Sequence, residues 1–108
     1  MVIWNEGART DLATILVALI TWKKHASVSL EEADKYIEDI EKTGNAICKL
    51  SFHSNAIYDT HKVYGNKVYR YERNKRTQWY IIYNWDKINK IAYVNKIVSN
   101  YHTVAGTA

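Results

Sequence analysis

The chain has 108 residues and a mass of 12.6 kDa, which is enough for one domain around a single buried core. Apolar residues make up 47% of it and charged residues 24%, which excludes a disordered or low-complexity protein. The longest apolar stretch, residues 12–20, is interrupted by Thr14 and falls short of the roughly 18 residues that a membrane helix needs.

The net charge of +4 is unevenly distributed. Residues 1–60 carry six basic and nine acidic side chains, a net of −3, whereas residues 61–96 carry nine basic and two acidic ones, a net of +7. Such asymmetry indicates that the second half faces a polyanion. A solvated surface rich in lysine explains the same numbers, and composition does not decide between the two.

Cysteine and histidine give no sign of a disulfide or a metal centre. Cys48 is the only cysteine, and the four histidines lack the spacing of metal ligands. The sequence contains no glycine-rich phosphate loop or nucleophile motif, and its N-terminus does not have the pattern of a secretory signal. We therefore expect a cytoplasmic protein without cofactor, metal site or membrane association.

The first half of the chain predicts two helices. After a β-prone run at residues 2–4, Asn5 can cap a helix whose apolar residues recur at helical spacing and which should end near Lys23–His25. A capping-box sequence at Ser29 begins a second helix, whose apolar stripe runs from Ala33 to Leu50. Gly44 lies in that stripe, where it should let the two helices approach closely. The pair should form an antiparallel helical hairpin.

The second half predicts strands. The sequence predicts a loop over residues 53–61 and a short strand at Lys62–Tyr64. Residues 67–73, 78–85 and 90–98 are rich in aromatic and β-branched residues, and short turns separate them. The sequence thus predicts a single α+β domain over residues 1–108, with a helical hairpin packed on one face of a mainly antiparallel sheet of four or five strands. The tail, residues 103–108, should be flexible.

Side-chain alternation with tight turns predicts which residues share a face of this sheet. One face should be the floor for the helices, with Val68, Ile81, Tyr83, Ala92, Val94 and Val98. The opposite face should be basic and aromatic, with Lys67, Tyr69, Tyr71, Arg73, Tyr80, Asn84, Tyr93 and Asn95.

A face of this composition is typical of proteins that bind single-stranded nucleic acid, where cations contact phosphates and aromatic rings stack on bases. The candidate binding residues are Lys67, Arg70, Lys75, Arg76, Lys96, Tyr69, Tyr71 and Tyr80. Arg73 is the candidate at a reacting phosphate, because its guanidinium supplies two parallel donors and stays charged. His102 is a candidate general acid or base. The alternative is that tyrosines simply favour half-buried strands and that a terminal histidine is merely exposed.

Several segments resemble toxins of the RelE/ParE superfamily. Residues 3–15 are similar to the family's opening strand with Trp, followed by its A-x-x-D-L-x-x-I helix, and residues 33–50 are similar to its A-x-x-[FY]-x-x-x-I…L helix. Residues 80–83 resemble its R-[ILV]-[ILV]-Y strand, and residues 91–97 its last strand. The similarity extends over residues 2–98 in the family's order.

The resemblance implies the toxin of a type II toxin–antitoxin module, neutralised by a cognate antitoxin protein. RelE-like members cut mRNA on the ribosome without a metal, and Arg73 is similar in position to their catalytic arginine. Tyr80, however, stands where many members have a second arginine. Lys96 and Val98 occupy the place of the family's catalytic residue on the last strand, and His102 lies four residues beyond. The resemblance leaves two alternatives open, a ParE-like inhibitor of DNA gyrase without catalytic activity and an inactive member that only binds an antitoxin.

Overall fold

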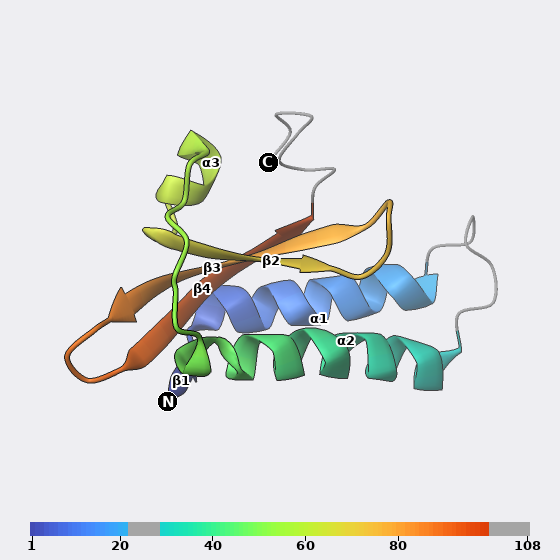
Figure 1. Ribbon diagram of the computed structural model, residues 1–108. Helices are drawn as coiled ribbons and strands as arrows, with labels where there is room; N and C mark the ends of the chain where they lie inside the picture. The colour runs from blue at the N-terminus through green and yellow to red at the C-terminus, as the bar shows by residue number, and fades with distance from the viewer. Residues whose placement is uncertain (22–28, 100–108) are drawn as a thin grey trace.

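The computed structural model describes residues 1–21 and 29–99. Two long helices come first and most of the strands follow (Figure 1). The elements in chain order are β1 (Val2–Trp4), α1 (Glu6–Thr21), α2 (Leu30–Asn45), a short 3-10 helix (Ile47–Lys49), α3 (Asp59–Lys62), β2 (Lys67–Glu72), β3 (Gln78–Asp86) and β4 (Ile91–Ser99). The expected α+β class is confirmed. The expected helix end at Lys23–His25 and the tail 103–108 lie outside the described residues.

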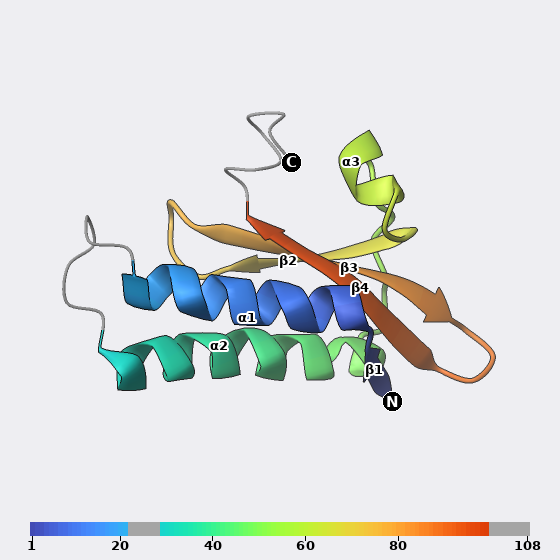
Figure 2. The same ribbon diagram turned by 180° about the vertical axis from the view of Figure 1, so that it is seen from behind.

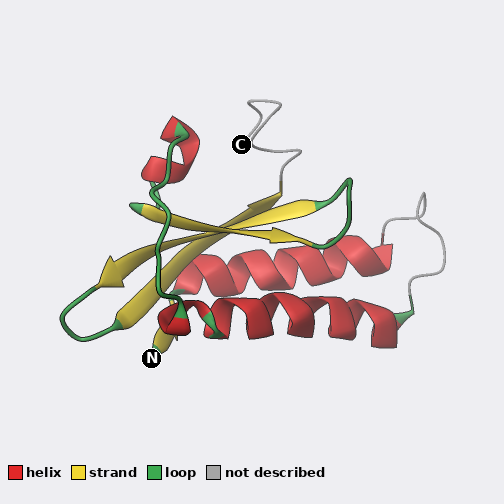
Figure 3. Cartoon of the chain, in the orientation of Figure 1, coloured by secondary structure: helices red, strands yellow, loops and turns green. Residues whose placement is uncertain are grey.

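The strands form one mixed sheet in the order β1-β4-β3-β2. β2, β3 and β4 are consecutive antiparallel strands, and β1 pairs in parallel with residues 92–94 of β4. α1 and α2 lie side by side along one face of this sheet, whereas α3 lies on the opposite side (Figures 1 and 2). Colouring by secondary structure shows the same two layers (Figure 3).

A carboxylate on α1 completes the edge of β4 beyond the short strand β1. Asp11 Oδ2 accepts a hydrogen bond from the backbone N–H of Ile97 at 2.9 Å, and Asp11 Oδ1 pairs with Lys96 Nζ at 3.0 Å. Because an unpaired edge amide next to a packed helix would otherwise lack a partner, Asp11 both satisfies β4 and fixes α1 against it.

α2 begins where the sequence predicts and ends earlier. The Ser29 hydroxyl accepts a hydrogen bond from the Glu32 backbone N–H at 3.1 Å, as a capping residue does. The helix ends at Asn45 instead of continuing to Leu50, and the chain tightens into the 3-10 helix, which carries the stripe on through buried Ile47.

Gly44 provides space for a tryptophan of β1, so the prediction that it brings the two helices together is wrong. A Cβ at Gly44 would lie 2.4 Å from Cζ2 of Trp4. The same indole donates from Nε1 to Asn45 Oδ1 at 2.7 Å. The absence of a side chain at Gly44 therefore lets β1 pack against the C-terminal end of α2.

The core lies between the sheet and the helical pair. Half-buried aromatic and aliphatic side chains surround a fully buried centre. That centre consists of Ala8, Ile40, Ile47, Ile81, Tyr83, Ala92, Val94 and Ile97. Tyr83, although completely buried, keeps a polar contact, because its hydroxyl lies 2.6 Å from Nδ1 of His53.

The connection from α2 to β2 crosses the open edge of the sheet. Ser54 and Ala56 exchange backbone hydrogen bonds with Val68 and Asn66, at 3.0 and 2.9 Å, so this stretch pairs briefly with β2. The chain then forms α3 and a turn at residues 63–64. The predicted short strand at Lys62–Tyr64 is therefore wrong. In the described residues, no helix has the length and apolar character to cross a membrane.

Candidate nucleic-acid interface

The predicted basic, aromatic face is divided between the two sides of the sheet. Tyr69 and Tyr71 stand opposite Ile81 and Trp79 and pack against the core beneath the helices. Tyr80 points the other way, since its neighbours in β3 face the core. The prediction that the three tyrosines share a surface is therefore wrong, and so is the assignment of Val68 to the floor.

Loop length explains this error. The expected faces required tight turns, but the hairpin between β2 and β3 keeps pairing through Arg73, whose backbone N–H bonds to Thr77 O at 3.0 Å. Three residues then close the turn, and β2 is placed one residue from the assumed register. A bulge opposite Ile82 and Tyr83 has the same effect on β4, where Ile97 instead of Val98 faces the core.

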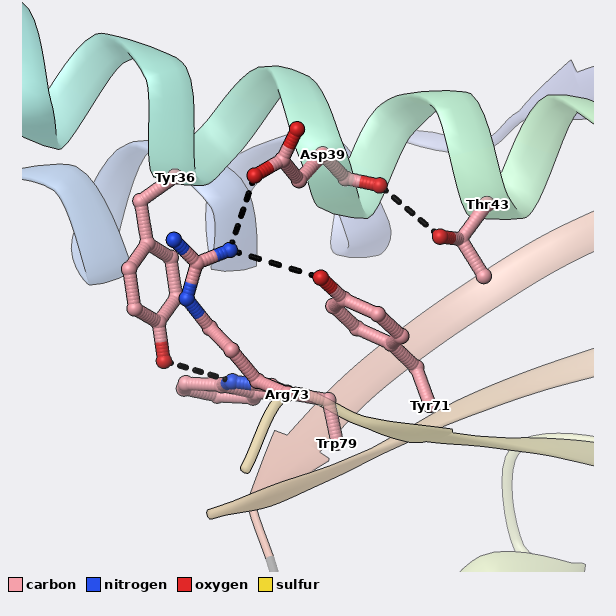
Figure 4. A network of polar contacts seen from close by, with 6 residues as sticks. All are labelled: Tyr36, Asp39, Thr43, Tyr71, Arg73 and Trp79. Carbon is pink, nitrogen blue, oxygen red and sulfur yellow. Dashed lines mark hydrogen bonds and ion pairs between the residues drawn. The ribbon is translucent and has the colours of Figure 1, made fainter.

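Arg73 lies on the helix side, at the end of the β2–β3 hairpin, and reaches α2 (Figure 4). Its Nη1 donates to Asp39 Oδ2 at 3.0 Å and to the Tyr71 hydroxyl at 3.3 Å. Its guanidinium carbon lies 3.8 Å from the centre of the Tyr36 ring, a cation–π contact. The guanidinium is thus held from three directions, while 25% of the side chain remains exposed.

The ring beneath this guanidinium is itself fixed. The Tyr36 hydroxyl accepts a hydrogen bond from Trp79 Nε1 at 2.9 Å, and the two rings meet edge to face at 6.2 Å (Figure 4). Burial raises the pKa of Tyr36, so the hydroxyl stays protonated at neutral pH. α2 and β3 together therefore build a rigid platform for Arg73.

The electrostatics of the Arg73–Asp39 pair favour its charged form. Hydrogen bonding from Arg73 holds the pKa of Asp39 below its usual value. Burial would lower the pKa of Arg73, but hydrogen bonds to Asp39 and Tyr71 outweigh it, and the pKa is raised. Both groups are consequently ionised at neutral pH.

The turn beyond Arg73 is basic and exposed. Asn74 Oδ1 accepts the backbone N–H groups of Arg76 and Thr77, each at 2.9 Å, and so fixes the turn. Lys75 and Arg76 on this turn are both exposed. Three predicted candidates, Arg73, Lys75 and Arg76, are therefore close together at one end of the molecule.

A second group of candidates lies on the face of the sheet opposite α1 and α2, which we call the outer face (Val68, Arg70, Tyr80, Ile82, Asn84, Tyr93 and Lys96). Arg70 is exposed and stands directly opposite the half-buried Tyr80. The Tyr80 ring lies 5.0 Å from the ring of His61, which α3 buries against this face.

Lys96 and Lys67 are engaged in intramolecular contacts. Lys96 pairs with Asp11 and lies 5.2 Å above the Tyr64 ring. Lys67 Nζ donates to Asn55 Oδ1 at 2.6 Å, beside the stretch that covers the start of β2. Both lysines help to join neighbouring segments, and neither lies with Arg73.

Histidine does not accompany Arg73 in the described residues. His102 lies outside them. Burial lowers the pKa of His61, and the pKa of His53 is also lowered, first by burial and then by the charge of Lys67. Both imidazoles are therefore neutral at pH 7 and belong to the packing. Within residues 1–21 and 29–99, no group of histidine, cysteine or acidic side chains is arranged to hold a metal ion.

Asp39 and Tyr36, which contact Arg73, do not stand out in the sequence. Tyr36 belongs to the predicted apolar stripe, and Asp39 is one of several acidic residues of α2. The available signal is their i, i+3 spacing, which places both on the side of α2 that the strands approach. This spacing points to Arg73 only when the structure shows that the β2–β3 hairpin ends next to Tyr36 and Asp39.

Known proteins offer no match. No model of a protein family matches the chain, and neither the curated proteins nor the solved structures give a significant similarity.

Proposed function

We propose that this protein is the toxin of a type II toxin–antitoxin module, with a RelE-like fold, and that it cleaves mRNA on the ribosome without a metal or cofactor. The observation that carries the proposal is the position of Arg73, a charged, partly exposed guanidinium held at the basic end of the β2–β3 hairpin. Its partners in the cytoplasm would be a cognate antitoxin protein, the ribosome and mRNA.

The proposed chemistry needs such a group. When a 2′-hydroxyl attacks the adjacent phosphate, negative charge accumulates on the phosphate oxygens in the transition state. A fixed guanidinium beside those oxygens stabilises that charge more than it stabilises the ground state. Arg73 is held by α2 before any substrate arrives, so little reorganisation accompanies the reaction.

The other candidates take binding roles in this proposal. Lys75 and Arg76 on the turn would contact the RNA backbone next to Arg73. Arg70 and Tyr80 lie on the outer face, so they would contact a different segment of RNA or the ribosome itself. Tyr69 and Tyr71 are excluded from base stacking because they pack beneath the helices.

The test is mRNA cleavage on translating ribosomes in a reconstituted system, with Arg73→Ala compared with wild type. Loss of one transition-state contact of this kind costs about 100-fold in rate or more. Arg9→Ala is the matched control, because Arg9 is an exposed arginine on α1, far along the chain from the hairpin. Wild-type protein that leaves mRNA intact would overturn the proposal, and so would full activity of Arg73→Ala.

A second candidate function, inhibition of DNA gyrase without catalysis, draws on a specific observation. The side chains in polar contact with Arg73 offer no histidine, and Asp39, whose pKa is lowered, is a weak base. This candidate predicts trapped gyrase–DNA complexes and DNA damage signalling before translation falls. An inactive member that only binds an antitoxin predicts neither response on expression.

A further inference from the structure

We propose that Asp39 is a positioning residue, which holds Arg73 by Nη1 so that the Nε–Nη2 edge of the guanidinium is left to bind a phosphate. This inference rests on the proposed function, since it assigns the ligand of the same site. Beyond that function, it assigns a role to Asp39 of α2 and specifies which edge of the Arg73 guanidinium binds the phosphate.

The contacts fall on one part of the guanidinium. Nη1 donates to both Asp39 and Tyr71, and the flat face of the group rests on Tyr36 (Figure 4). Arginine has five N–H donors, of which three belong to Nε and Nη2. No side chain in the described part of the chain accepts a hydrogen bond from those three.

The remaining edge suits a phosphate. Nε–H and Nη2–H point in parallel and match two oxygens of a phosphate group. The Arg73 side chain is 25% exposed, and in this proposal the ligand reaches the edge from solvent while Asp39 keeps its contact with Nη1. The exposed basic turn at Lys75 and Arg76 lies beside it, so the anion would meet net positive charge despite Asp39.

Asp39 is well placed for this task. It lies in the interior of α2, where Thr43 donates to its backbone carbonyl at 2.8 Å, and 30% of its side chain is exposed. Its lowered pKa makes it a poor acceptor of the 2′-hydroxyl proton, which argues for holding Arg73 over general-base catalysis. The inference thus predicts that the oxygen acceptor matters more than the basicity of the carboxylate.

The experiment compares Asp39→Ala with Asp39→Asn in ribosome-dependent cleavage, measuring single-turnover rate and ribosome affinity separately. Asp39→Ala removes the acceptor and should lower the rate about 100-fold, since small misplacement of a catalytic group costs that much. Asp39→Asn keeps an oxygen in the same place and should stay within about threefold of wild type. Asp34→Ala, which changes an exposed acid five residues earlier in α2, is the control and should change nothing.

A second readout does not depend on activity. Titration of the 15N-labelled protein with inorganic phosphate should shift the Arg73 Nε–Hε resonance in wild type and in Asp39→Asn, but not in Asp39→Ala. If wild type fails to cleave mRNA while the resonance still shifts, the proposed function fails and the anion site stands. If Asp39→Ala cleaves like wild type while Arg73→Ala is inactive, or if Asp39→Asn falls as far as Asp39→Ala, the positioning role is refuted.

Discussion

Gly44 offers the sharpest test of the packing that holds β1 against α2. Replacing a helix glycine by alanine normally stabilises a helix by about 1 kcal/mol. Here the new Cβ would lie 2.4 and 2.5 Å from two ring carbons of Trp4, well inside contact distance. The indole cannot move aside freely, because its Nε1 donates a hydrogen bond to Asn45 and because β1 is paired with β4.

The expected cost of this overpacking is near the upper end of its usual range, about 3 kcal/mol. Subtracting about 1 kcal/mol for helix propensity leaves a net destabilisation of about 2 kcal/mol for Gly44→Ala. In a domain of this size that corresponds to a fall in Tm of roughly 8–16 °C. Thermal and urea unfolding followed by circular dichroism would measure it.

Trp4→Phe supplies the matching background, since the shorter ring does not reach the space above Gly44. In that background, Gly44→Ala should become neutral or stabilising by up to about 1 kcal/mol. Lys42→Ala, an exposed change two residues earlier, should stay within about 0.5 kcal/mol. If Gly44→Ala is as stable as wild type while Trp4 is present, the assigned contact is incorrect.

Two further predictions concern the helix cap and the two histidines His53 and His61. Ser29→Ala should lower the free energy of unfolding by about 1 kcal/mol, and Ser29→Asn should restore it, because only the former removes the acceptor for Glu32 N–H. Stability should also fall as the pH drops below about 6.5, the ordinary pKa of histidine, because burial lowers the pKa of His53 and His61 and the unfolded chain then binds more protons. Urea midpoints at pH 7.5 and 5.0 would show this, with a smaller difference for His53→Gln, and equal midpoints would contradict it.

The elements of the fold follow from local signals. Helical spacing and the serine cap predicted the start of α2, and aromatic, β-branched runs predicted the three antiparallel strands to within one residue at each end. These signals depend on neighbours in sequence, so the sequence contains them. The end of α2 and the helix α3 depend on contacts with distant strands, such as that of Trp4 with Gly44, and sequence patterns gave no sign of them.

Which residues share a face of the sheet depends on the lengths of the loops between the strands. A single extra loop residue exchanges the two faces of a strand, and no composition signal reports it. Tyr69 and Tyr71, which were predicted to lie on a ligand surface, therefore pack against the core. Arg73 lies on the helix side, where it contacts Asp39. Residue types predicted Arg73 as a candidate site residue, but they did not predict its contacts with Asp39 and Tyr36.

The division of the cations constrains any ligand. Arg73 lies on the helix side and Arg70 on the outer face, so one short RNA segment cannot contact both across a sheet. A ligand that uses both must pass around the open edge of β2 or the basic turn at Lys75, where the sheet ends. In the proposed function, charge on the turn would then contribute to binding and Arg73 to rate, because a strand bent around that end brings its phosphates closest to Lys75. If the proposed mRNA cleavage is correct, separate effects on affinity and on rate are therefore the expected signature of this interface.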